Sequence, residues 1–210
     1  FWIPDEPPGS DIEAWMFAGT DGNEPTYASD RVAACVDACR KRGPLNGAVD
    51  GGAFVGSWTL QLISHFGEVH AFEPIAANHA CLVLNTTRLY GVPRHKRALA
   101  DRMGQMVRAS DDATVPHGHK VRFAEPHEPC EFDSIMLDYF PPKQLDLVKL
   151  DLEGFEYQAL LGGIDVIHDH KPVVMIEEKH DPERRATKLL ESWGMRCTWK
   201  KKHDCLFTWS

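Results

Sequence analysis

Short apolar segments alternate with amphipathic segments along most of the chain. Short apolar runs bounded by glycine, proline or acidic residues are typical of buried strands, and apolar residues three or four positions apart are typical of helices. The pattern predicts strands ending at Asp50 and over residues 68–72, 96–100, 145–150, 172–176, 195–200 and 205–209. It predicts a helix that is capped by Ser29 or Asp30 and runs to residue 42, and helices over residues 57–66, 76–90, 155–161, 164–168 and 182–193. This alternation predicts an α/β fold with a parallel sheet covered on both faces, closed by a hairpin of antiparallel strands.

Two segments lack this regularity. Residues 1–27 carry four prolines and several aromatic side chains among acidic residues, and we treat them as an N-terminal arm that covers the core, lies over the substrate pocket or contacts another subunit. Residues 28–210 then form a single domain. Within it, residues 103–140 contain three short strand patterns, over 105–109, 120–124 and 132–135, which predict a hairpin insertion beside the ligand site.

The stretch from Ala48 to Trp58 reads AVDGGAFVGSW and predicts a strand, a tight turn and a helix. Glycines permit positive φ and a close approach of the backbone to a ligand. The first N–H groups of the following helix face the same space. Glu73 ends the next strand, where an acid is placed to accept hydrogen bonds from ribose hydroxyls. The two features predict a site for a nucleotide-like ligand.

Charge and composition narrow the classes of partner. The chain has 210 residues, of which 43% are hydrophobic and 26% charged, as in an ordinary globular domain. A formal net charge of −8 would repel nucleic acid and anionic membranes, so we expect neither as a partner. The sequence has no apolar run long enough for a membrane span and no signal peptide. Its six cysteines follow no disulfide or metal spacing and are expected to be reduced thiols in a cytoplasmic protein.

Four motifs resemble the FkbM-type methyltransferases, which use S-adenosylmethionine. The first is the glycine turn, in which Phe54 stands where many relatives in the wider superfamily have glycine. The other three are the segments AFEPIAANHACLVLN, VKLDLEGFEYQALLGG and KPVVMIEE. The later WGM resembles the turn before the family's last two strands. The resemblance covers residues 45–210. It implies the class I methyltransferase fold, a Rossmann-like three-layer sandwich whose mostly parallel seven-stranded sheet has an antiparallel last strand. It also implies methyl transfer, usually to a hydroxyl oxygen of a sugar or another small molecule.

The resemblance also implies the residues that hold the cofactor. The first loop would cradle its methionine end, Glu73 its ribose and the third strand its adenine, with Asp151 near the sulfonium. By position these residues are Asp50, Gly51, Gly52, Ala53, Phe54, Gly56, Ser57, Glu73, Pro74, Asn78, Ala98, Leu99 and Asp151.

Methyl transfer requires alignment of the donor and acceptor and removal of a proton from the acceptor. Ligands of open α/β sheets bind at the carboxyl ends of the strands, where this chain places Asp50, Glu73, Asp151, Glu153, Glu177, Glu178 and His180. We take Asp151, Glu177 and His180 as the catalytic candidates. His180 has the ordinary pKa best suited to a general base, or else it caps the turn that follows it. Alternatively, Asp151 with Glu177 or Glu178 binds Mg²⁺, or these acids cap helices and anchor loops.

Other interpretations compete with the methyltransferase. Gly51, Gly56 and Glu73 loosely match the dinucleotide fingerprint, which favours a NAD(P)-dependent oxidoreductase. A catalytically inactive binding module of the same shape is a third hypothesis. A zinc site built from His117, His119, His127 and Cys130 fits no established spacing. The acceptor would be selected by the N-terminal arm and by the insertion.

Overall fold

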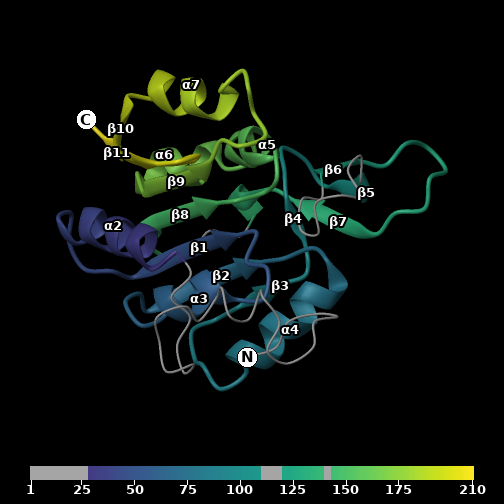
Figure 1. The fold of residues 1–210 in the computed structure, drawn as a ribbon, viewed down its shortest axis with the longest axis horizontal. Helices are drawn as coiled ribbons and strands as arrows, with labels where there is room; N and C mark the ends of the chain where they lie inside the picture. The colour runs from purple at the N-terminus through teal and green to yellow at the C-terminus, as the bar shows by residue number, and fades with distance from the viewer. Residues whose placement is uncertain (1–27, 110–119, 140–142) are drawn as a thin grey trace.

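The computed structural model describes residues 28–109, 120–139 and 143–210, and the N-terminal arm lies outside the described residues. A seven-stranded sheet forms the centre of the domain (Figure 1), with the strand order β10-β11-β9-β8-β1-β2-β3. Its strands are β1 (Gly47–Gly51), β2 (Glu68–Phe72), β3 (Arg94–His95), β8 (Leu147–Leu150), β9 (Val173–Glu177), β10 (Met195–Lys201) and β11 (Asp204–Trp209).

Strand direction follows the predicted pattern. β1 pairs in parallel with β2 and β8, and β8 pairs in parallel with β9. The last strand, β11, runs antiparallel to both of its neighbours, β9 and β10. Every residue of β1 and β8 is buried, as expected for central strands covered on both faces. The fold is therefore the mostly parallel seven-stranded sandwich that the sequence predicts.

Helices cover both faces of this sheet, and each face has its own core (Figure 1). Helices α2 (Ser29–Arg40), α3 (Ser57–Leu62) and α4 (Ala76–Thr86) lie on one face, and α5 (Glu156–Leu161), α6 (Ile164–His170) and α7 (Arg185–Ser192) on the other. Cys35 and Cys39 of α2 pack with Trp58 and Leu62 of α3, whereas Leu160 and Leu190 pack against the opposite face. All six cysteines carry free thiols.

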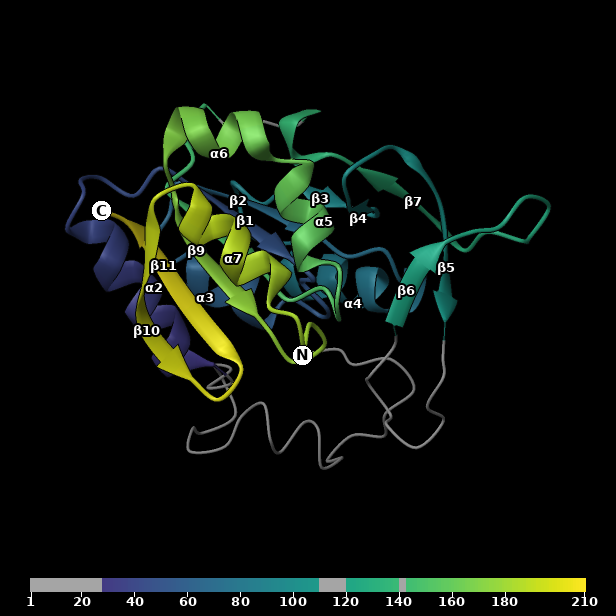
Figure 2. The same cartoon turned by 90° about the horizontal axis from the view of Figure 1, so that it is seen from above.

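A second sheet accounts for the irregular segment. It has the order β4-β7-β5-β6 and is made of β4 (Ala98–Leu99), β5 (Gly104–Ala109), β6 (Lys120–Phe123) and β7 (Phe132–Ile135). A short 3-10 helix, η1 (Leu137–Tyr139), follows it. Figures 1 and 2 both place this sheet at the end of the molecule opposite the β10–β11 hairpin. The three strands predicted for the insertion correspond to β5, β6 and β7.

Two sequence predictions are wrong in detail. The predicted strand over residues 96–100 is not the third strand of the main sheet: β3 lies at Arg94–His95, and β4 pairs with β7 of the second sheet instead. Which sheet each of these short strands joins depends on pairing between residues far apart in sequence, and the local apolar pattern does not show that pairing. The predicted cap of the first helix is also wrong, because α2 begins after Ala28, which has a left-handed backbone and no side-chain cap.

Candidate active site

The turn after β1 is built around a glycine that no other residue can replace without movement. Gly52 has φ +72°, and a Cβ added there would lie 1.9 Å from the carbonyl oxygen of Asp151. The N–H groups of Gly52 and Ala53 both donate to the carbonyl of Phe72, at 3.0 and 2.9 Å. Backbone hydrogen bonds to Phe72 and the close approach to the Asp151 carbonyl therefore hold the turn against the ends of β2 and β8.

A buried ion pair stands behind the turn. Asp50 is fully buried and accepts hydrogen bonds from the Thr59 hydroxyl (2.6 Å) and the Lys149 ammonium (3.0 Å). Lys149 also donates to the carbonyls of Gly51 (3.1 Å) and Gly52 (2.9 Å). Asp50 has no exposed surface, and its carboxylate holds the loop through Thr59 and Lys149. Sequence analysis missed Lys149, although a lysine inside the apolar run LVKL was the available signal.

Glu73 joins the end of β2 to the same turn. Its Oε2 accepts the N–H of Phe54 (2.9 Å), and its Oε1 accepts the N–H of Ile75 (2.9 Å) and the Asn78 amide (3.4 Å). Burial raises the pKa of the Glu73 carboxyl to about 7, against the lowering effect of these three donors. A carboxylate has about four acceptor positions, so one remains for a further donor such as a ribose hydroxyl.

Ala98 and Leu99 form a buried apolar surface beneath the turn. Leu99 is almost completely buried, and its Cδ1 would lie 3.1 Å from a Cβ added at Gly51. Ala98 packs against Met106 and Phe132 of the second sheet. The structure therefore brings this predicted pair to the glycine turn even though it belongs to the second sheet.

Two of the three catalytic candidates, Glu177 and His180, meet where β8 and β9 end, together with Glu153 and not with Asp151. Ligand atoms of Glu153, Glu177 and His180 all lie within 4.8 Å of one another, and Glu153 Oε2 is 2.8 Å from His180 Nε2. We call these three residues the strand-end cluster. Burial, together with the charges of Asp151, Glu153 and Asp204, raises the pKa of Glu177 well above its ordinary value. Burial and Asp151 likewise raise the pKa of Glu153 to about 7. The cluster thus collects like charges that repel one another.

The neighbouring acids have other partners. Glu178 accepts hydrogen bonds from the Thr187 hydroxyl and from Arg184 Nε (3.3 Å), so it faces α7 and not the strand-end cluster. Asp181 accepts the N–H groups of Arg185 (2.7 Å) and Ala186 (3.2 Å) and caps α7. The capping role considered for His180 therefore belongs to Asp181.

Glu156 anchors the loop that carries Glu153. Its carboxylate accepts the N–H of Leu152 at 2.6 Å and that of Gly154 at 3.1 Å. Sequence analysis listed Glu153 among the strand-end acids but did not select it. Its position one residue before Gly154 gave no sign that the loop would turn it toward His180.

The histidine and cysteine group considered for zinc is not supported as a site in the part of the chain that the structure describes. His117 and His119 lie outside the described residues, and Cys130 is exposed. Among the described residues, the strand-end cluster is the one group of three or more metal-ligating side chains whose ligand atoms converge.

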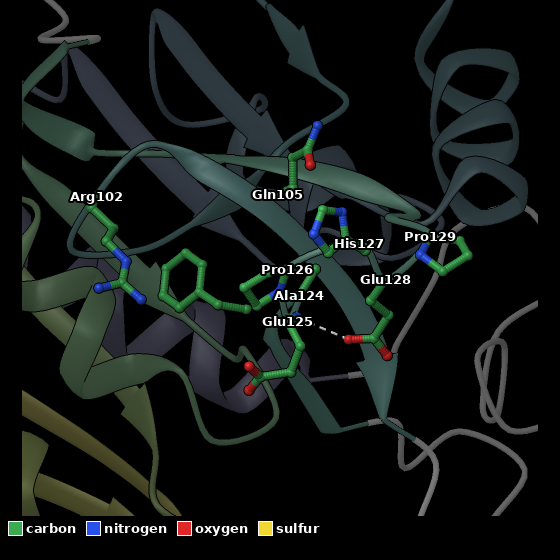
Figure 3. Close-up of a pocket in the computed structure, with 9 residues that line it drawn as sticks. Arg102, Gln105, Ala124, Glu125, Pro126, His127, Glu128 and Pro129 are labelled. Atoms are coloured by element: carbon green, nitrogen blue, oxygen red, sulfur yellow. Dashed lines mark hydrogen bonds between the residues drawn. The ribbon is translucent and has the colours of Figure 1, made fainter.

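An open pocket of about 500 Å³ lies on the second sheet (Figure 3). Arg102 covers one face of the Phe123 ring at 4.0 Å, and Phe123 meets Phe155 with ring centroids 6.0 Å apart. Phe155 directly follows the Glu153–Gly154 loop in sequence, so the aromatic contact joins the pocket wall to the residue after that loop. Its lining residues are Arg102, Gln105, Phe123, Ala124, Glu125, Pro126, His127, Glu128 and Pro129.

Comparison with solved structures identifies proteins of the same fold. A methyltransferase FkbM from Methylobacillus flagellatus is 22% identical with a TM-score of 0.51, and the match covers 78% of this chain and 43% of that one. A putative RNA methyltransferase from Pyrococcus horikoshii is 12% identical with a TM-score of 0.52, covering 99% of this chain and 93% of that one. Magnesium protoporphyrin IX methyltransferase from Synechocystis, solved with bound S-adenosylmethionine, is 12% identical with a TM-score of 0.51, covering 86% and 79%.

Sequence comparison identifies the family. No curated protein matches the chain. None of the helices in the described residues is both long and apolar enough to cross a bilayer. The family model described as the methyltransferase FkbM domain matches residues 50–198, which contain both the glycine turn and the strand-end cluster. The chain therefore belongs to the FkbM methyltransferase family.

Proposed function

We propose that this chain transfers a methyl group from S-adenosylmethionine to a hydroxyl oxygen of a small molecule or sugar. The observation that carries the proposal is the position of two features at one edge of the sheet. The glycine turn ends β1, and the strand-end cluster ends the neighbouring strands β8 and β9. Donor and acceptor sites at adjacent strand ends are what in-line transfer requires.

The residues of the turn fit the proposed cofactor. Gly52 and Gly56 have φ of +72° and +97°, so the backbone turns sharply at both positions, as a loop that approaches a ligand closely requires. We assign the methionine end of the cofactor to residues 50–57, its ribose to Glu73 with Pro74 and Asn78, and its adenine to the surface near Ala98 and Leu99. Asp50 acts by holding the loop through Lys149.

When bound, S-adenosylmethionine supplies an activated methyl group. The acceptor oxygen would supply the electron pair for its new bond to the methyl carbon, and the pair of the broken bond would remain on sulfur. The acceptor also loses its proton, which Asp151, Glu177 and His180 are placed to receive or to direct. Two arrangements serve this step: His180 accepts the proton directly, or a divalent ion held by the cluster acidifies the hydroxyl.

The acceptor is proposed to be a small molecule because the net charge of −8 disfavours binding of a polyanion. The pocket beside Phe123 offers a wall for the part of the acceptor distant from the methyl group. Its aromatic surface and polar rim suit a hydroxylated molecule.

Binding of S-adenosylhomocysteine tests the cofactor assignment. We expect micromolar affinity in wild type and a loss of about tenfold to a hundredfold in Glu73→Ala, since a hydrogen bond to a charged group contributes about 1.5–3 kcal/mol. The loss should nearly vanish for an analogue without ribose hydroxyls. Glu68→Ala, at the opposite end of β2, is the matched control and should bind normally. Equal loss for both ligands would show that Glu73 only supports the turn.

A further inference from the structure

We infer that the strand-end cluster, Glu153, Glu177 and His180, is a binding site for a divalent first-row transition-metal ion of the Mn²⁺ or Zn²⁺ class. The inference deepens the proposed function, because the ion would lie where the acceptor hydroxyl must be placed. It rests on how the three side chains converge, how their surroundings fix them and what charge they leave unbalanced.

Convergence is the first argument. The three ligands come from separate places: Glu153 from the loop after β8, Glu177 from the end of β9 and His180 from the turn before α7. Their ligand atoms nevertheless lie within 4.8 Å of one another. Adjacent ligands of one ion are about 3 Å apart when each lies about 2.1 Å from it. The 2.8 Å separation of Glu153 Oε2 and His180 Nε2 is close to that value.

The backbone around the cluster is fixed by contacts that leave the three ligands together. Glu156 holds the loop of Glu153 through the N–H groups of Leu152 and Gly154. Gly154 has φ +104°, and a Cβ there would lie 3.3 Å from the Cβ of His180, so glycine lets the two loops approach. Asp181 fixes the other side by capping α7. A site prearranged in this way binds an ion without a large ordering cost.

Charge is the third argument. Glu153 and Glu177 are both partly buried, and each lies close enough to Asp151 to be repelled by its charge. The nearby ammonium of Lys149 is engaged with Asp50 and two carbonyls, and the Asp204 carboxylate pairs with Arg31. A divalent cation between the two carboxylates would replace repulsion by attraction.

The donor set selects the class of ion. Mg²⁺ favours oxygen ligands, as in the set of Asp151 with Glu177 or Glu178 considered from sequence. The structure turns Glu178 toward α7 and brings an imidazole to Glu177 instead. Two carboxylates and one imidazole suit Mn²⁺ or Zn²⁺ better than Mg²⁺. In this arrangement His180 would be a ligand, and the ion would lower the pKa of an acceptor hydroxyl bound to it, whose proton would pass to Asp151 or to water.

Titration of EDTA-treated full-length chain with Mn²⁺, followed by the loss of the free-ion electron paramagnetic signal, tests the site. We expect one Mn²⁺ per chain, displaced by Zn²⁺. Since changes outside the ligand set of a metal site already weaken binding tenfold or more, Glu177→Gln and His180→Ala should each weaken Mn²⁺ by at least about tenfold. Glu178→Gln is the matched control, because its side chain lies on the other side of the same strand end, and it should bind Mn²⁺ normally.

A second readout separates binding from folding defects. Mn²⁺ in excess should raise the thermal midpoint of wild type and Glu178→Gln but not that of Glu177→Gln. Absence of Mn²⁺ and Zn²⁺ binding at millimolar concentration, or equal binding by all variants, would overturn the inference. Binding of S-adenosylhomocysteine is measured on the same samples. If it persists without metal binding, the proposed function stands with His180 as the direct proton acceptor.

Discussion

The glycine turn and the strand-end cluster lie at the same edge of one sheet but differ in how their buried carboxylates are compensated by neighbouring groups. At the turn, Asp50 is balanced by the Lys149 ammonium and the Thr59 hydroxyl, and the remaining ammonium hydrogens reach two carbonyls. At the cluster, burial and, after it, the charge of the neighbouring Asp151 raise the pKa of Glu153 and of Glu177. The buried acid at the turn is therefore paired with a cation, whereas the glutamates of the cluster lie beside a further acid.

This difference distinguishes residues that fix the backbone from residues suited to bind a ligand or to exchange a proton. A satisfied buried network fixes one backbone conformation, and removing any part of it costs stability. Groups whose pKa values are displaced by burial and like charge are concentrated at functional sites, where a ligand or proton relieves the repulsion. Removing a charge should therefore lower the stability of the protein at the turn and raise it at the cluster.

The largest effect is expected from Lys149→Met. It leaves the Asp50 carboxylate buried without its cation, with the Thr59 hydroxyl still donating to it, and breaking a buried pair costs about 3–5 kcal/mol. For a domain of this size the thermal midpoint should fall by roughly 10 °C. Lys201→Met is the control, because Lys201 pairs with Asp30 on the surface, where an ion pair contributes less than about 1 kcal/mol. Equal midpoints for the two variants would contradict the role given to Lys149.

Gly52→Ala should have the next largest effect. The added carbon would meet the Asp151 carbonyl at 1.9 Å, so the turn must move. We expect a loss of roughly 3 kcal/mol, from overpacking and left-handed strain together, and loss of S-adenosylhomocysteine binding. Gly194→Ala is matched for positive φ, at +89°, but its added carbon meets no atom within 4 Å. It should cost only about 1 kcal/mol and leave calorimetric binding intact.

Much of the fold could be predicted because each central strand is apolar and ends at a glycine or an acid. Strand ends also located Glu177 and His180 correctly at one place, since parallel strands bring their carboxyl ends together. The pairing of β4 with β7 could not be predicted, because it joins residues far apart in sequence. Glu153 and Lys149 were missed for a related reason: their roles depend on the partners that the folded backbone brings to them.

The smallest of these effects is expected from Glu177→Gln in metal-free protein. Because the folded-state pKa of Glu177 is raised, its ionisation opposes folding, and stability is lost as the pH rises through that value. Removing the charge should raise stability by about 1 kcal/mol at pH 8 and by much less at pH 5. Glu183→Gln, an exposed neighbour, should change stability by less than about 0.5 kcal/mol at either pH. A destabilised Glu177→Gln at pH 8 would contradict the contrast between the two regions.

The central claim is that the glycine turn holds S-adenosylmethionine and not a dinucleotide. Parallel calorimetric titrations of the wild-type chain with S-adenosylhomocysteine and with NADH test it most directly. We predict saturable binding of S-adenosylhomocysteine at one site per chain, with micromolar affinity, and no heat of binding from NADH at the same concentration. Saturable binding of NADH without binding of S-adenosylhomocysteine would contradict the claim.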